Sequence, residues 1–210
     1  MTYSVKEIFL TLQGEGARAG RVSVFCRFSG CNLWSGREED RLQAACRFCD
    51  TDFVGTDGND GGKFTCATDL ISSIERIWGP EKRNRYVVFT GGEPLLQLDA
   101  ALIGAAHDAG FEVAVETNGT LLPPDGVDWI CVSPKGKSDW ILRSGNELKL
   151  VFPQTDLMPE QIEGTQFDSY YLQPMDGVSR AENTEQAIRY CLKNPQWSLS
   201  LQTHKMIGIP

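Results

Sequence analysis

The chain has 210 residues, of which 41% are hydrophobic, and it carries a formal net charge of −8. This length suits one domain with a sizeable core, so we expect a single domain over residues 1–210. Because the acidic residues are scattered along the chain, we expect no broad basic surface that could bind nucleic acid. The chain lacks a signal-like start and any run of about 20 apolar residues, which predicts a cytoplasmic protein without membrane contact.

Short β-branched, aromatic or alternating runs predict six strands. In chain order they are Val22–Ser29, Tyr86–Thr90, Val113–Thr117, Trp129–Val132, Leu148–Phe152 and Tyr170–Gln173, with Leu199–His204 as a candidate seventh. Helical periodicity predicts a helix after a Thr68 N-cap, a second from Leu98 to Ala109, and a third around 187–192 after Asn183. The Gly- and Asp-rich segment 55–63 predicts a turn region.

The opening order of strand, helix, strand, helix and strand favours a parallel sheet with right-handed crossovers. The links after Thr117 and Val132 are too short or too rich in Pro and Gly for full helices. We therefore predict an α/β fold, an incomplete and eroded (β/α) barrel of about six strands with few helices.

Polar residues gather where the predicted strands end. Thr90 and Gln173 are two of them, and three pairs lie two residues apart and so on one strand face: Glu116 with Asn118, Ser133 with Lys135, and Gln202 with His204. Barrel enzymes build their sites at the carboxyl ends of parallel strands, although ordinary edge polarity would give a similar pattern at any single position.

Seven cysteines are present, and three of them, Cys31, Cys46 and Cys49, form a C-x14-C-x2-C pattern. The spacing allows a zinc site completed by Cys66, a redox pair of Cys46 and Cys49, or an iron–sulfur cluster with three thiolate ligands and one open iron. The spacing alone does not separate these alternatives. The charged segment 32–45 between the first two cysteines reads as an insertion, and Cys26, Cys131 and Cys191 fall in apolar patterns typical of a core.

A glycine turn, Gly91-Gly92-Glu93-Pro94, follows the strand that ends at Thr90. Two glycines allow the backbone to approach a ligand closely. Together with the three cysteines and Phe48 before the last of them, this turn resembles the radical S-adenosylmethionine superfamily. The usual pattern there is C-x3-C-x2-C, so the present chain departs in its first gap.

Further motifs cover nearly the whole chain: LQGEG at 12–16, CDT at 49–51, ETNG at 116–119, SPK at 133–135, LQPM at 172–175 and QTHK at 202–205. Taken together they resemble the 7-carboxy-7-deazaguanine synthase family. LQGEG is shared with glycyl-radical-enzyme activases, which remain a rival; a zinc-stabilised binding module without catalysis is a rival from another class.

The resemblance implies a lyase that converts 6-carboxy-5,6,7,8-tetrahydropterin to 7-carboxy-7-deazaguanine with loss of ammonia, a step toward queuosine in tRNA. It implies a [4Fe–4S] cluster on Cys31, Cys46 and Cys49, and S-adenosylmethionine used catalytically to form a 5′-deoxyadenosyl radical. This radical is the reactive group, so no protein acid or base is assigned. Mg²⁺ on Thr51, an electron donor such as flavodoxin, and a homodimer are further implications.

The resemblance also assigns ligand contacts. S-adenosylmethionine is expected at Phe48, Asp50, Gly92, Glu116, Asn118, Ser133, Pro134, Lys135, Gln173, Pro174 and Met175. The pterin is expected at Leu12, Gln13, Gly14, Glu15, Arg27, Thr90, His204 and Pro210, where Arg27 suits the substrate carboxylate as a two-pronged donor. Either Glu15 or the C-terminal carboxylate of Pro210 is expected to accept from the pterin N–H groups, and Lys149 has no assigned role.

Overall fold

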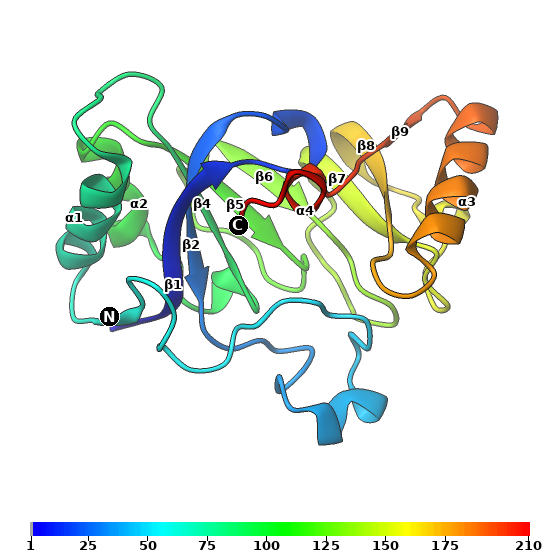
Figure 1. Ribbon diagram of the computed structural model, residues 1–210, viewed down its shortest axis with the longest axis horizontal. Coiled ribbons are helices and arrows are strands. Elements are labelled where there is room, and N and C mark those ends of the chain that lie inside the picture. Colours follow the sequence, from blue (N-terminus) through cyan, green and yellow to red (C-terminus); the bar gives the residue numbers. More distant parts are fainter. Residues whose placement is uncertain (1) are drawn as a thin grey trace.

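The computed structural model describes residues 2–210, and these form one sheet of nine strands in the order β3-β1-β2-β4-β5-β6-β7-β8-β9 (Figure 1). Strands β2 and β4 to β9 run parallel, whereas β1 pairs antiparallel with both β2 and β3. The strands are β1 Tyr3–Leu12, β2 Val22–Phe28, β3 Gly62–Phe64, β4 Tyr86–Gly91, β5 Glu112–Thr117, β6 Trp129–Val132, β7 Ser144–Phe152, β8 Gln166–Pro174 and β9 Trp197–Leu199.

The six predicted strands correspond to β2 and β4 to β8, and the parallel sheet is confirmed. The sheet does not close, because β3 and β9 lie at its two ends, so the incomplete barrel is also confirmed. Strand β1 was not predicted from the sequence. A register shift between Val5 and Glu7 breaks the alternation of buried and exposed residues along that strand, and alternation is the signal on which strand prediction depends.

The helices are α1 Ala67–Trp78, α2 Ala100–Asp108, α3 Arg180–Lys193 and α4 Thr203–Ile207. The first three were predicted, but two N-caps were wrong. Helix α1 begins after Cys66 and not after Thr68. Asn183 lies inside α3, which begins after Ser179, and its amide donates to the carbonyl oxygen of Met175 at 2.9 Å.

The candidate strand Leu199–His204 was also wrong, because β9 ends at Leu199 and α4 follows. The backbone N–H and the hydroxyl of Thr203 both donate to the carbonyl oxygen of Gly14, at 3.0 and 2.9 Å. This tertiary contact turns the chain away from the sheet. Gln202 and His204 therefore do not share the face of a strand.

Two apolar clusters hold the helices against the sheet. Helices α1 and α2 cover β1, β2, β4 and β5, and α3 packs on β7 and β8 (Figure 1). Cys26 and Cys131 are buried as predicted, whereas Cys191 is half-buried beside the second cluster. No helix within residues 2–210 is long and apolar enough to cross a membrane.

The loop between β1 and β2 packs across the amino ends of the parallel strands. The guanidinium groups of Arg18 and Arg21 lie over the rings of Trp129 and Tyr86, at 4.1 and 3.8 Å, and both bind the carboxylate of Glu112. These partners stand at the amino ends of β4, β5 and β6. The opposite end, where the parallel strands finish, is left to form a cavity.

Candidate active site

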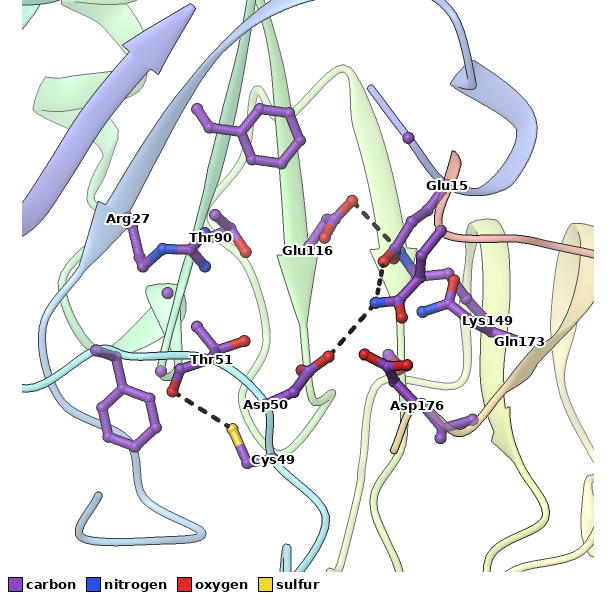
Figure 2. Close-up of a pocket in the computed structure, with 18 of the residues that line it drawn as sticks. Glu15, Arg27, Cys49, Asp50, Thr51, Thr90, Glu116, Lys149, Gln173 and Asp176 are labelled. Carbon is purple, nitrogen blue, oxygen red and sulfur yellow. Dashed lines mark hydrogen bonds and ion pairs between the residues drawn. The ribbon is translucent and has the colours of Figure 1, made fainter. Parts of the chain in front are cut away.

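A cavity of about 330 Å³ opens at the carboxyl ends of the parallel strands. Its wall includes Thr90 from β4, Glu116 from β5 and Gln173 from β8, and the segment that carries the cysteines crosses beside them (Figure 2). The strand-end polar residues that the sequence singled out thus meet in one place.

All but one of the sequence-predicted site residues line this cavity. They are Leu12, Gln13, Gly14, Glu15, Arg27, Cys31, Cys46, Phe48, Cys49, Asp50, Thr51, Thr90, Gly92, Glu116, Asn118, Ser133, Lys135, Gln173, Pro174, Met175, His204 and Pro210. The exception is Pro134, which is buried behind the wall, where its carbonyl oxygen accepts from Gln154 at 3.2 Å.

The three cysteines present their thiols to the same cavity. Cys31 follows β2, and burial raises the pKa of its thiol, although the N–H of Leu33 donates to its sulfur at 3.4 Å. A hydrogen bond from Cys46 lowers the pKa of Cys49 to about 6. The same contact raises the pKa of Cys46, so Cys49 is the thiol of this pair that loses its proton first.

The fourth ligand of the zinc alternative lies elsewhere. Cys66 is exposed at the start of α1, where its sulfur contacts the hydroxyl of Thr68 at 3.1 Å, and it does not line the cavity. Among residues 2–210, no three His, Cys, Asp or Glu side chains converge as ligands of a single metal ion.

The glycine turn after β4 packs directly on the end of β2. A Cβ on Gly92 would lie 2.0 Å from the carbonyl oxygen of Gly30 and 2.8 Å from the Cβ of Cys31. Gly91 has a φ of 131°, and a Cβ there would lie 2.2 Å from the carbonyl oxygen of Phe28. Only glycine allows the two backbones to approach this closely beside the first cysteine.

Glu93 in the same turn is fully buried, and this tightly bound role was missed by the sequence analysis. Its carboxylate accepts from the hydroxyl of Thr117 at 2.7 Å and from the N–H of Asn118 at 2.8 Å. Burial raises the pKa of Glu93. The side chain of Glu93 therefore joins the end of β4 to the end of β5. In the sequence, the GGEP motif alone indicated that Glu93 is important.

Charged side chains from distant segments pair across the cavity. Lys149 on β7 binds Glu15 at 2.5 Å and Glu116 at 3.4 Å (Figure 2). On the other wall, Nε of Arg27 donates to Glu7 at 2.8 Å. Arg27 thus faces the cavity as expected and already has a carboxylate partner.

The C-terminal segment forms one side of the cavity. The ammonium of Lys205 binds Asp50 and Asp176, each at 2.7 Å, and so joins α4 to the cysteine segment and to the loop after β8. One oxygen of the C-terminal carboxylate of Pro210 accepts from the hydroxyl of Thr11 at 2.7 Å. His204 and Pro210 are thereby held against β1.

Comparison with known proteins identifies the family. No protein-family model matches the chain. The 7-carboxy-7-deazaguanine synthase of Bordetella pertussis is 65% identical over the full length of both chains, and that of Bacteroides thetaiotaomicron is 34% identical over the full length of both. The chain belongs to the 7-carboxy-7-deazaguanine synthase family. The crystal structure of QueE from Escherichia coli superposes with a TM-score of 0.68 at 25% identity, covering 96% of this chain and 94% of that one.

The resemblance to the 7-carboxy-7-deazaguanine synthase family that the sequence motifs carry is therefore confirmed. The departure in the cysteine motif has a structural counterpart in segment 32–45. This segment is mostly exposed and contains a 3₁₀ turn at Glu38–Gln43. It lies outside the sheet and leaves the strand framework of the synthase fold intact (Figure 1).

Proposed function

We propose that the chain converts 6-carboxy-5,6,7,8-tetrahydropterin to 7-carboxy-7-deazaguanine with loss of ammonia, a step of 7-deazapurine and queuosine biosynthesis. One observation carries this proposal: three cysteines, a glycine turn and the strand-end polar groups line one cavity in a chain that is 65% identical to a synthase of this name. Substrate and product differ only by ammonia, so the net reaction needs no oxidant.

Cys31, Cys46 and Cys49 are the proposed ligands of a [4Fe–4S] cluster. All three residues line one cavity, and three thiolates leave one iron of such a cluster open for an outside ligand. When bound, the cluster and S-adenosylmethionine supply the one-electron chemistry that starts hydrogen abstraction. The chain itself holds these groups in a pocket formed largely by its own backbone and strand ends.

The S-adenosylmethionine site is proposed along the ends of β4 to β8. Gly92 lies beside the Cys31 junction and lines the cavity where the methionine end is proposed, and Glu116 offers carboxylate oxygens for hydroxyl groups. The ammonium of Lys135 lies 5.9 Å from the ring centre of Phe48 and donates to Ser133 at 2.6 Å. Asp50, Asn118, Gln173, Pro174 and Met175 complete the proposed contacts.

A Mg²⁺ ion is proposed at Thr51. The residue lines the cavity two positions after the last cysteine, and Mg²⁺ prefers oxygen ligands while keeping most of its shell for water or substrate oxygens. A single hydroxyl ligand from the chain is consistent with that preference.

The pterin site is proposed between β1, β2 and the C-terminal segment. Arg27 would share its guanidinium between Glu7 and the substrate carboxylate, because only its Nε is engaged with Glu7. Glu15 has both carboxylate oxygens bound, by Lys149 and by Gln202. The C-terminal carboxylate of Pro210 accepts from Thr11 through one oxygen, which leaves its other oxygen for the pterin, so we assign Pro210 as the main acceptor for the pterin N–H groups. Leu12, Gln13, Gly14, Thr90 and His204 complete this wall.

An external one-electron donor such as flavodoxin, a homodimeric assembly and a cytoplasmic setting belong to the same proposal. They follow the family resemblance and the need for an electron to reach the cluster. Turnover of the pterin without any protein substrate also separates this proposal from a glycyl-radical-enzyme activase, whose substrate is a protein.

The test is anaerobic purification and cluster reconstitution, followed by incubation with the carboxytetrahydropterin, S-adenosylmethionine, Mg²⁺ and a reductant. We expect about four irons and four sulfides per chain, and 7-carboxy-7-deazaguanine and ammonia in equal amounts. Cys49→Ser should lose both cluster and turnover, whereas Cys66→Ser should keep them, because Cys66 lies outside the cavity. A colourless, zinc-loaded protein, or turnover that requires a protein substrate, would refute the proposal.

A further inference from the structure

Lys149 is a buried cation inside the barrel, and neither the sequence motifs nor the proposed ligand contacts give it a role. Its side chain is 4% exposed. Burying an ammonium group is costly unless carboxylates surround it. Burial alone would lower the pKa of Lys149, but Cys131 and the carboxylates of Glu116, Glu15 and Glu147 raise that pKa well above the usual value.

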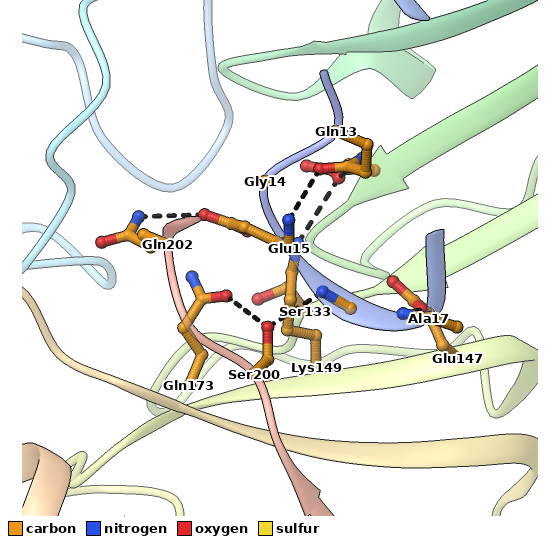
Figure 3. Close-up of polar contacts among 12 residues, drawn as sticks. Gln13, Gly14, Glu15, Ala17, Ser133, Glu147, Lys149, Gln173, Ser200 and Gln202 are labelled. Carbon is orange, nitrogen blue, oxygen red and sulfur yellow. Dashed lines mark hydrogen bonds and ion pairs between the residues drawn. The ribbon is translucent and has the colours of Figure 1, made fainter. Parts of the chain in front are cut away.

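The partners of Lys149 belong to a closed ring of polar contacts, with Glu116 labelled in Figure 2 and Gln13 and Glu15 in Figure 3. Nζ of Lys149 binds Glu15 and Glu116, on the β1–β2 loop and on β5. The N–H of Glu15 donates to the side-chain oxygen of Gln13 at 3.1 Å, and the amide nitrogen of Gln13 donates to Glu116 at 3.0 Å. Each contact fixes the orientation of the next, so the ring joins three segments that are far apart in the chain.

The ring extends to the C-terminal segment through Glu15. The amide of Gln202 donates to the second carboxylate oxygen of Glu15 at 2.9 Å (Figure 3). The next residue, Thr203, donates twice to the carbonyl oxygen of Gly14. The segment that carries His204 and Pro210 into the cavity is therefore anchored on the loop that Lys149 holds.

The charge arrangement explains why a cation is needed at this point. Glu147 also faces the region from β7, but its carboxylate accepts from the N–H of Ala17 at 2.8 Å. Glu15 and Glu116 would repel each other across the cavity without a positive charge between them. Although burial would raise it, Lys149 and Gln202 lower the pKa of Glu15 to about 2, so the carboxylate remains ionised.

We propose that Lys149 is a positioning residue that fixes the Glu15 loop, Glu116 and the C-terminal segment 200–210 in one arrangement, which completes the pterin side of the cavity. In this role Lys149 acts through Glu15 and Glu116, although its own side chain also lines the cavity. The part of this inference that concerns the pterin rests on the proposed function. The anchoring of the C-terminal segment does not.

The test compares Lys149→Met with the wild type in two independent measurements. The first is hydrogen exchange of the backbone amides of Thr203 and Ile209, which donate to Gly14 and His204. The second is the kinetic constants of the reconstituted enzyme. In Lys149→Met we expect the amides of Thr203 and Ile209 to exchange at least about tenfold faster than in the wild type. We also expect the pterin KM to rise about 10- to 100-fold, while kcat changes by less than about threefold.

The matched control is Arg85→Met. Arg85 is also a buried cation, with a side chain 2% exposed and an ion pair to Glu75 at 2.7 Å, but it does not line the cavity. This control should lower the melting temperature without changing exchange at 203 and 209 or the pterin KM. A general loss of stability in Lys149→Met would instead raise exchange throughout the chain.

Glu15→Gln provides a second variant if Lys149→Met does not fold. It breaks the same ion pair from the other side and should release the same segment. In the double variant the two effects should be strongly non-additive, because both remove one interaction. Additive effects, or wild-type exchange at 203 and 209 in either single variant, would overturn the proposal. A wild type that makes no carboxydeazaguanine would refute the proposed function, while the exchange comparison would still decide the role of Lys149.

Discussion

Arg41 donates through Nη1 to the carbonyl oxygen of Cys49 at 3.1 Å, although it lies in the insertion that separates the first two cysteines. The same nitrogen donates to the carbonyl oxygen of Arg47 at 3.0 Å. The guanidinium lies 4.0 Å from the ring centre of Trp34 and also binds Glu38. Segment 32–45 therefore stabilises the turn from Cys46 to Cys49 through these contacts of Arg41.

Replacing Arg41 should loosen the turn that holds Cys46 and Cys49. Arg41→Gln removes the charged donor shared by two carbonyl groups, and each such bond contributes about 1.5–3 kcal/mol. We expect iron to be lost to a chelator about tenfold faster than from the wild type, as followed by absorbance. Arg37→Gln is the control, because Arg37 is exposed and only its loose 3.9 Å pair with Glu39 is lost. Equal rates in the two variants would contradict this stabilising role.

Gly14→Ala should displace the C-terminal segment. A Cβ at this position would lie 2.0 Å from Nδ1 of His204 and 2.9 Å from its Cβ, so the whole side chain must move. We expect the pterin KM to rise about tenfold or more, measured in steady-state turnover. Gly104→Ala is the matched control: the new Cβ meets nothing within 4 Å inside helix α2, so that variant should be about 0.5–1 kcal/mol more stable and kinetically unchanged.

Extending the chain beyond Pro210 should weaken binding of the pterin. A C-terminal tag converts the terminal carboxylate to an amide and adds bulk beside the contact between Pro210 and Thr11. We expect the pterin KM to rise about tenfold or more, while an N-terminal tag leaves it unchanged. If the C-terminally tagged protein keeps the wild-type KM, Pro210 is not the acceptor and Glu15 is the remaining candidate.

Glu15 should make stability depend on pH in a defined window. Its folded pKa of about 2 lies below the ordinary carboxyl value of 4.5, so ionised Glu15 stabilises the folded state at and above pH 5. This contribution, about 3 kcal/mol, is lost as the pH falls from about 4.5 to 2. In urea unfolding, the stability difference between wild type and Glu15→Gln should be constant from pH 8 to 5 and shrink below pH 4.5. A constant difference down to pH 3 would contradict the ion pair.

Local sequence patterns determined much of this protein. Short β-branched runs identified six parallel strands, because a strand that is buried on both faces is marked by a continuous run of apolar residues of strand length. The cysteine spacing, the glycine turn and the strand-end polar motifs identified the cavity and the family, because ligands bound by backbone and strand ends leave contiguous motifs.

Only the tertiary structure decided how distant segments complete the site. The partner of Pro210 is Thr11, 199 residues away, and the ring around Lys149 depends on the order of strands in the sheet. Contacts of this kind leave no periodic pattern in the sequence. The sequence therefore predicts a strand over Leu199–His204, whereas the contact of Thr203 with Gly14 is accompanied by a turn and helix α4. Buried charges are placed by the partners that neutralise them, and those partners are neighbours in space and not in sequence.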